Sequence, residues 1–244
     1  MFAAIFTLAL ITVHVAAEVP SYIHVCGRKD PNIDECILHN VENIKDKICE
    51  GIPELDIESN NPFRLDKIVI FDTPAAHIYF IDANVLGLCN FVVNSFHIDM
   101  NTLKFNVDLS FKKLQINGTY DVNIHILSTN FAQKAPIYIT TENVGAKVDA
   151  DISIVTKSGK RYVYLSKMTI NLDIKGYDIA FDPTQSEQLQ QLSQIVRNFV
   201  GNNQKEILNF IKPSLEKEIT KRIMSTSNDI VKHFTYEELF LDRT

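Results

Sequence analysis

Side chains that commonly perform catalysis or bind metals are scattered along this sequence of 244 residues. None of the seven histidines lies two, three or four residues from another, the spacings that would place a pair on one helix or strand face. The sequence has no nucleophile elbow, zinc-protease, P-loop or dinucleotide-binding motif. Asp149 and Asp151 share one face of an expected strand, but a solvated outer face explains them better than a catalytic carboxylate pair. We therefore expect no catalytic residue, no metal and no cofactor.

The four cysteines favour disulfides over metal binding, because no C-x-x-C spacing occurs. Cys26 and Cys36 are close in sequence and enclose Gly27, so we predict that they form a bridge. That bridge would stabilise the fold by about 3 kcal/mol in the chain-entropy model. Cys49 and Cys89 either form a second bridge or remain free and buried, and the sequence alone leaves both alternatives open.

The first 17 residues carry no charged side chain and end in the small residues of Val15-Ala-Ala17. The apolar run is too short to cross ~30 Å of hydrocarbon, so it predicts a secretory signal peptide, with a buried N-terminal strand as the alternative. Residues 18–244 would then form a single ligand-binding domain. No later run reaches about 18 uninterrupted apolar residues, so we expect a secreted, extracellular protein without stable membrane insertion.

Charge and glycosylation signals agree with an extracellular protein. The net charge of −6 and the pI of about 5.6 argue against nucleic-acid binding, which requires a basic surface. Asn117-Gly-Thr119 is an N-glycosylation sequon, so Asn117 is the predicted glycan acceptor. An Asn-Gly turn at the end of a strand explains the same three residues equally well.

Apolar periodicity divides the chain into helical and extended regions. A helical spacing from Ile33 to about Cys49 follows a capping Asn32 and stops at Gly51. Between about residues 63 and 181 the period is two, with β-branched and aromatic enrichment, which predicts an antiparallel sheet with one dry face. The expected strands cover residues 68–71, 77–81, 91–93, 105–109, 120–126, 137–139, 148–154, 162–165 and 170–174. A hairpin turn is expected at 157–160, where Gly159 is free to adopt a positive φ.

From about residue 186 the period is again helical and gives one long apolar stripe. Gly201-Asn-Asn203 is a weak point of this helix, and Pro213 should kink it. Unbroken, some 45 residues would extend nearly ~70 Å at 1.5 Å each, and only the preceding sheet is long enough to cover them. The predicted fold class is α+β, with a strongly curved antiparallel sheet wrapped around the long C-terminal helix and enclosing an elongated apolar cavity.

The predicted cavity has one wall from the sheet and one from the helix. The sheet wall comprises Phe80, Val85, Tyr120, Val122, Tyr138, Val148 and Ile170. The helix wall comprises Leu192, Val196, Phe199, Ile207, Phe210 and Ile211. A hydroxyl of Tyr120 or Tyr138 would orient an ester, epoxide or carboxyl oxygen of a ligand. Ordinary core packing is the simpler explanation for most of the aromatic residues.

Several short motifs, in this order and spacing, resemble the insect juvenile-hormone-binding and takeout family over nearly the whole mature chain. The motifs are the pair Cys26 and Cys36, Gly51-Ile-Pro-Glu-Leu55, Leu114-Gln-Ile-Asn-Gly-Thr-Tyr120, Asn198-Phe-Val-Gly-Asn-Asn203, Ile211-Lys-Pro-Ser-Leu-Glu216 and Phe234-Thr-Tyr-Glu-Glu-Leu-Phe240. The resemblance implies a curved sheet around a long helix and the carriage of lipophilic ligands in body fluid or sensory tissue. The chain departs from the family pattern between Ser128 and Pro136, where glycines are expected and none occurs.

These observations predict a secreted carrier of a small lipophilic ligand, such as a terpenoid hormone or a fatty acid, held in an internal tunnel. The alternative is a secreted protein-interaction module of the same fold, with a filled cavity and an acidic surface that docks a receptor. Ligand retained by the purified protein would favour the carrier, and its absence would favour the module.

Overall fold

The computed structural model describes residues 19–55, 57–59, 61–126, 129–181, 194, 197–198 and 201–243. The predicted signal peptide lies outside this range. The helical elements are α1 (Ile33–Glu50), η1 (Pro53–Leu55), η2 (Leu88–Asn90), α3 (Gln204–Val231) and α4 (Tyr236–Leu239). The strands are β1 (Phe63–Thr73), β2 (Ala76–Leu86), β3 (Phe91–Asp99), β4 (Lys104–Ile126), β5 (Thr129–Lys157), β6 (Lys160–Asp173) and β7 (Asp178–Phe181).

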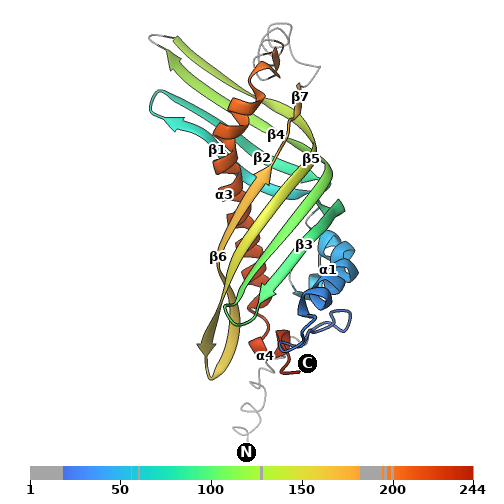
Figure 1. Cartoon of the computed structure of the whole chain (residues 1–244). Helices are drawn as coiled ribbons and strands as arrows, with labels where there is room; N and C mark the ends of the chain where they lie inside the picture. The colour runs from blue at the N-terminus through green and yellow to red at the C-terminus, as the bar shows by residue number, and fades with distance from the viewer. Residues whose placement is uncertain are drawn as a thin grey trace, which may run out of the picture.

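All seven strands form one antiparallel sheet, as the period-two pattern predicts (Figure 1). The main path runs β1-β2-β4-β5-β6, while β3 pairs with β4 and β7 pairs with β5. Segments that look like separate strands in the sequence are continuous, because β4 has 23 residues and β5 has 29. The predicted turn between β5 and β6 is confirmed, with Gly159 at φ 76°. These long strands give the sheet enough length to follow a long helix.

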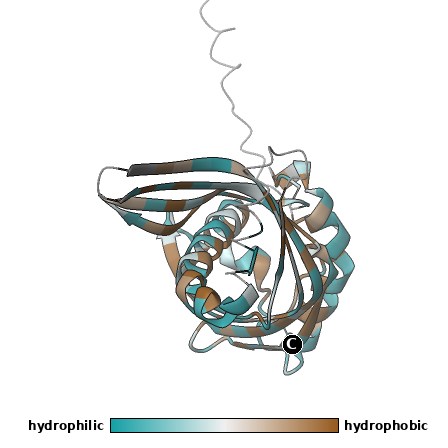
Figure 2. Cartoon of the chain, turned by 90° about the horizontal axis from the view of Figure 1, so that it is seen from above, coloured by the Kyte–Doolittle hydropathy of each residue, from teal (hydrophilic) through white to brown (hydrophobic). Residues whose placement is uncertain are grey.

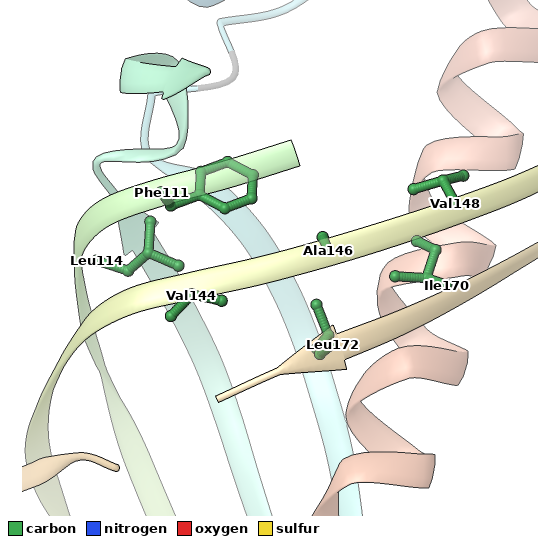
Figure 3. Close-up of a cluster of buried hydrophobic side chains, with 7 residues drawn as sticks. All are labelled: Phe111, Leu114, Val144, Ala146, Val148, Ile170 and Leu172. Carbon is green, nitrogen blue, oxygen red and sulfur yellow. The ribbon is translucent and has the colours of Figure 1, made fainter. Parts of the chain in front are cut away.

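The sheet bends where β4 and β5 change the phase of their alternation together. Phe111 pairs with Val144 and Leu114 pairs with Thr141, and all four residues are buried. Buried residues three positions apart cannot lie on one face of a regular strand, whose side chains alternate with period two. Asn143, at φ 54°, takes up the change in β5. Because both strands change phase together, the pairing register is the same on both sides of the bend. Figure 3 shows the two strands curving side by side at this point.

Helix α3 lies along the concave face and contacts both edge strands of the main path, β1 and β6. Leu215 and Ile219 pack against two apolar clusters of the concave face, one on either side of the helix. Seen from above, the sheet curves around the helix (Figure 2). The predicted weak point is confirmed, since α3 begins at Gln204 with Asn203 as its N-cap. Pro213 lies inside the continuous helix α3.

An apolar cluster lies at the C-terminal end of α3. Phe234, which follows α3, packs with Ile52, Leu55 and Ile57 from the segment after α1. Helix α1 covers the neighbouring region, where Ile33 packs with other apolar residues of its cluster from β3, β4 and β5. Among the described helices, none combines the length and the hydropathy that crossing a membrane requires.

Two disulfides tie the N-terminal region together. The predicted bridge between Cys26 and Cys36 is confirmed, with the Cα atoms 6.0 Å apart. Cys49 and Cys89 form a second bridge with a Cα separation of 5.9 Å, which decides between the two alternatives left by the sequence. This second bridge joins the last turn of α1 to η2, just before β3. Helix α1 is therefore anchored covalently at its C-terminal end to the sheet.

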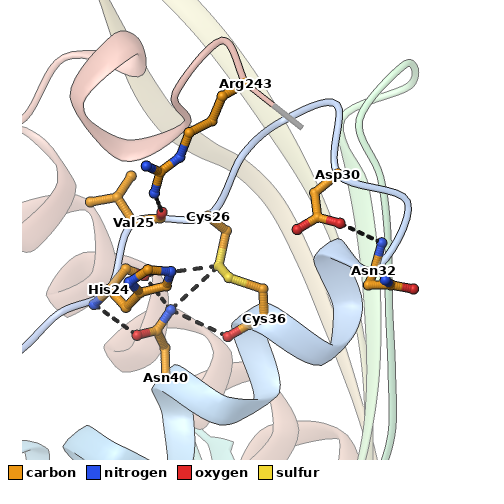
Figure 4. The surroundings of a disulfide bond; sticks show 8 residues. All are labelled: His24, Val25, Cys26, Asp30, Asn32, Cys36, Asn40 and Arg243. Carbon is orange, nitrogen blue, oxygen red and sulfur yellow. Dashed lines mark hydrogen bonds between the residues drawn. A yellow bond between two sulfur atoms is a disulfide. The ribbon is translucent and has the colours of Figure 1, made fainter.

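The loop closed by Cys26 and Cys36 holds the C-terminal tail (Figure 4). Arg243 donates to the carbonyl oxygen of Val25 at 2.8 Å. Arg28 and Lys29 contact the carboxylate of Asp242 at 2.8 and 2.6 Å. The first and last described segments of the chain therefore stabilise each other.

We expect this contact to make stability sensitive to acid. Hydrogen bonds from Lys29 and Arg28 hold the pKa of Asp242 below its ordinary value. The contribution is complete above the unfolded-state pKa of about 4 and is lost as the pH falls through the lower folded-state pKa. Urea unfolding from pH 6 to pH 2 should therefore show a steeper acid loss for the wild type than for Asp242→Asn. The exposed Asp66 on β1 provides the control: Asp66→Asn should keep the wild-type slope, and equal slopes for all three proteins would contradict the prediction.

Candidate ligand-binding site

Two groups of buried apolar side chains line the concave face on either side of α3. The β6-side cluster (Figure 3) consists of Phe111, Leu114, Val144, Ala146, Val148, Ile170 and Leu172. The β1-side cluster consists of Leu65, Ile68, Phe80, Ala83 and Ile137. Leu215 and Ile219 of α3 pack against both clusters, so the helix and the sheet share one apolar interior.

Six of the seven strand residues predicted for the cavity wall lie on the concave face. Phe80, Val148 and Ile170 are each 8% exposed and belong to the two clusters. The other three are only half-buried: Val85 pairs with Ile116, Val122 pairs with Ile78, and Tyr120 pairs with Phe80. The ring of Tyr120 also meets Phe181 edge-on, with the centroids 5.9 Å apart.

Tyr138 was expected to face inward, and the structure corrects this prediction. Its side chain is 49% exposed, while its neighbour Ile137 is 9% exposed and belongs to the β1-side cluster. An uninterrupted period of two from Val148 would place Tyr138 on the concave face. The phase change at Asn143 lies between them and moves Tyr138 to the convex face, so its hydroxyl is not available to the interior.

The helix residues of the predicted wall divide into three groups. Ile207 and Ile211 are half-buried. Phe210 is 57% exposed, and its ring centroid lies 6.4 Å from that of Phe71 in β1. Leu192, Val196 and Phe199 lie outside the described residues.

The end of the concave face opposite Phe234 exposes large apolar side chains. Phe71 pairs with Ile78 and Phe131 pairs with Ile124, which places both phenylalanines on the same face as Phe80 and Tyr120. Phe71, Phe131 and Phe210 are 37%, 40% and 57% exposed. We call these three residues the open end. Exposed aromatic rings on the inner face of a curved sheet and on the helix beside it are typical of a binding site for an apolar molecule.

Buried polar atoms lie next to this apolar surface. Gln133 pairs with Val122, and its buried Nε2 has no hydrogen-bond partner among the described residues. The buried hydroxyl of Tyr177 also lacks one in that part of the chain. Burial raises the pKa of Tyr120 and of Tyr177, which keeps both hydroxyls protonated as donors. Gln133 was not predicted from the sequence, although it lies two residues before the buried Ala135 and therefore on the same face of the strand.

Gly118 shapes the β1-side cluster through its missing side chain. A Cβ atom at this position would lie 2.6 Å from Cε2 of Phe80, so the phenylalanine ring occupies the space above the glycine. The Asn-Gly turn considered for the sequon is wrong, because Asn117 and Gly118 lie within β4. Asn117 pairs with Tyr138 on the convex side. Glycosylation of Asn117 stays a prediction.

The acidic and histidine side chains form structural contacts. Asp149 is exposed, and Asp151 lies 3.8 Å from Lys104, in agreement with a solvated outer face. His97 contacts Asp34 of α1 at 2.8 Å, which links α1 to β3. Within the described part of the chain, no three His, Cys, Asp or Glu side chains are grouped so that they could hold a metal ion.

Comparison with known proteins decides the family. The family model described as haemolymph juvenile hormone binding protein matches residues 2–241. The chain belongs to this family. Membership makes it a ligand-binding carrier in general terms and not an enzyme. The resemblance derived from the cysteine pair and the Gly-x-Tyr strand is thereby confirmed.

Structural comparison gives the same fold for this family member. The crystal structure of Epiphyas postvittana Takeout 1 is similar, with a TM-score of 0.71 and 16% identity over 89% of this chain and 99% of that chain. A crystal structure of lipopolysaccharide binding protein gives a TM-score of only 0.33 and 11% identity, over 79% of this chain and 39% of that chain, and carries no argument. Comparison with curated proteins gave no match.

Proposed function

We propose that the chain is a secreted carrier that holds a small lipophilic ligand between α3 and the concave face of the sheet. The observation that carries this proposal is the open end, where Phe71, Phe131 and Phe210 remain exposed on the inner surface. Burying these rings against a ligand would remove apolar surface from water. Family membership supports the same role.

The ligand we propose is mainly apolar and carries at least one oxygen. Burial of about twelve methylenes at ~0.8 kcal/mol each gives roughly 10 kcal/mol before ordering costs. Micromolar to nanomolar affinity then follows. The amide of Gln133 and the hydroxyl of Tyr177 are the donors that would meet the oxygen, because an unpaired buried donor is costly until it finds an acceptor. The half-buried hydroxyl of Tyr120 is a further donor on the same face. A juvenile-hormone-like terpenoid and a fatty acid both fit this description.

We also propose the extracellular setting that the sequence indicates. Cleavage after Ala17 and export to body fluid or sensory tissue agree with the two disulfides, which persist in oxidising compartments. The test of function is mass spectrometry of an organic extract of protein purified from its natural source. A retained lipid supports the carrier. A clean extract together with no binding of apolar probes would support the protein-interaction module.

Filling the interior should weaken the binding of an apolar probe. Val122 is half-buried on the concave face of β4, so Val122→Trp places an indole in the space between the sheet and α3. We expect about tenfold weaker binding of the neutral fluorophore N-phenyl-1-naphthylamine, measured by fluorescence titration, with unchanged far-UV circular dichroism. The matched control is Tyr138→Trp on the convex face, which should bind the fluorophore like the wild type. Equal affinities for both variants would show that the probe does not bind in this interior.

A further inference from the structure

A groove separates β6 from the neighbouring flank of α3. Its volume is about 650 Å³, and it opens to solvent. Met168 and Ile170 line it from the strand, and Lys217, Lys221 and Met224 line it from the helix. Tyr164, which also lines the groove, is 46% exposed. The groove therefore combines apolar side chains with two ammonium groups.

At both ends of this groove, polar side chains of α3 form hydrogen bonds with the backbone of β6, as a neighbouring strand would. Asn228 accepts from the backbone N–H of Leu165 at 2.8 Å and donates to its carbonyl oxygen at 3.1 Å. Glu216 accepts from the backbone N–H of Leu172 at 2.7 Å. The free edge of β6 is thus bound to the helix at two points.

Between those two points, the edge of β6 has unused hydrogen-bond donors. Alternate residues of a strand direct their N–H groups to the same side. The N–H of Leu172 faces α3, so those of Ile170 and Met168 face α3 as well. Neither has an acceptor among the described residues of the helix. Two backbone donors therefore point into the groove.

The charge of the groove is positive on its helix side. Lys217 and Lys221 lie one turn apart, and neither forms an ion pair with any described residue. The carboxylate of Glu216 is already engaged by the Leu172 N–H and by Lys212 at 3.5 Å. An anion in the groove would thus meet two lysines and backbone donors, while Lys212 balances the charge of Glu216 at one end.

We propose that this groove binds a long-chain carboxylate. Its headgroup lies between Lys217 and Lys221 and accepts from the backbone N–H groups, while its chain lies along Met168, Ile170 and Met224. Charge complementarity identifies the headgroup, and the apolar lining identifies the chain. An added peptide strand does not fit, because Asn228 and Glu216 bridge the groove at both ends. The site lies on the flank of α3 next to β6 and goes beyond the proposed carrier site, which it adjoins through Ile170 of the β6-side cluster and through Met168, which packs against that cluster. Met224 lies on the helix side of the groove.

The methionines provide a local readout. The sequence has four methionines: Met1 lies in the predicted leader, Met168 and Met224 line the groove, and Met100 packs beside α1 as an internal reference. Protein labelled with ¹³C-methyl methionine is titrated with dodecanoate, with dodecanol and with inorganic phosphate. We expect dodecanoate to shift the Met168 and Met224 resonances and leave Met100 unchanged. Dodecanol lacks the charged headgroup and phosphate lacks the apolar chain. The affinity of each, measured from the shifts of these two resonances, should therefore be at least about tenfold weaker.

Variants separate this groove from the interior. Lys217→Gln with Lys221→Gln should weaken the affinity for dodecanoate, measured from the Met224 shift, by about tenfold. The same variant should bind N-phenyl-1-naphthylamine like the wild type. The control pair, Lys112→Gln with Lys157→Gln, changes the net charge equally on exposed lysines outside the groove and should retain the shift. Equal responses to dodecanoate and dodecanol, or wild-type dodecanoate binding by the Lys217 and Lys221 variant, would overturn the proposal. If the Lys217 and Lys221 variant lost fluorophore binding, the fluorophore would bind in the groove, and this result would count against the interior carrier.

Discussion

Replacing both Cys49 and Cys89 with alanine is expected to lower the free energy of unfolding by about 4 kcal/mol. The bridge closes a loop with a sequence separation of 40, and the chain-entropy model gives this loss for a loop of that length. Guanidinium unfolding without reductant measures the difference. Because the effect acts mainly on the unfolded chain, the denaturant slope should rise as that chain becomes more expanded.

This pair is the better test of loop closure because both cysteines are only half-buried. Cys26 is 5% exposed within an apolar cluster, so its replacement would add a packing loss to the entropic one. Fully reduced wild-type protein serves as the control and should be at least as destabilised as the Cys49 and Cys89 variant. An unfolding free energy within about 1 kcal/mol of the wild type would show that the loop is already constrained in the unfolded chain.

Phe80→Ala should be the most damaging single substitution in the β1-side cluster. The ring is 8% exposed, and its loss leaves a cavity that costs about 3–5 kcal/mol. Gly118→Ala should cost about 1–3 kcal/mol in the wild type, because the new Cβ would lie 2.6 and 2.7 Å from two ring carbons of Phe80. In the Phe80→Ala background the same glycine substitution should cost less than about 1 kcal/mol, because only the backbone oxygen of Ile81, 3.1 Å from the new Cβ, then remains close.

A double-mutant cycle measured by chemical denaturation tests this coupling. The control is Gly145→Ala in β5, where the new Cβ would meet Asp173 at an ordinary 3.4 Å. That substitution should change the unfolding free energy by less than about 1 kcal/mol in either background. Additive costs for Phe80→Ala and Gly118→Ala would show that the ring does not depend on the glycine.

The sequence predicts the elements of this fold well because their signals are local. The spacing from Ile33 to Cys49, the stop at Gly51 and the interruption before Gln204 all correspond to observed helix boundaries. Continuity of β4 and β5 could not be predicted, since polar stretches within a strand resemble the loops that separate two strands. The pairing of Cys49 with Cys89 depends on how α1 lies against the sheet, which is a long-range property.

For the candidate site, too, the sequence predicts what depends on local signals and not what depends on long-range contacts. Six inward strand residues follow from simple alternation, and Tyr138 fails because the phase change at Asn143 leaves no clear mark in the apolar pattern. The groove beside β6 could not be predicted from the sequence either. It depends on where Asn228 and Glu216 reach the edge of β6, and side chains on helices give no local indication of such partners.

The contact of α3 with both β1 and β6 has a consequence for how the protein is made. A chain leaves the ribosome from its N-terminus, so all seven strands emerge before the helix that covers their two outer edges. During that interval the sheet exposes unpaired backbone groups and one apolar face, the combination that favours aggregation. Both disulfides lie ahead of the strands or between the early ones and can form before α3 appears. We therefore expect chaperones that shield the nascent sheet until α3 has been synthesised to raise the yield of folded protein.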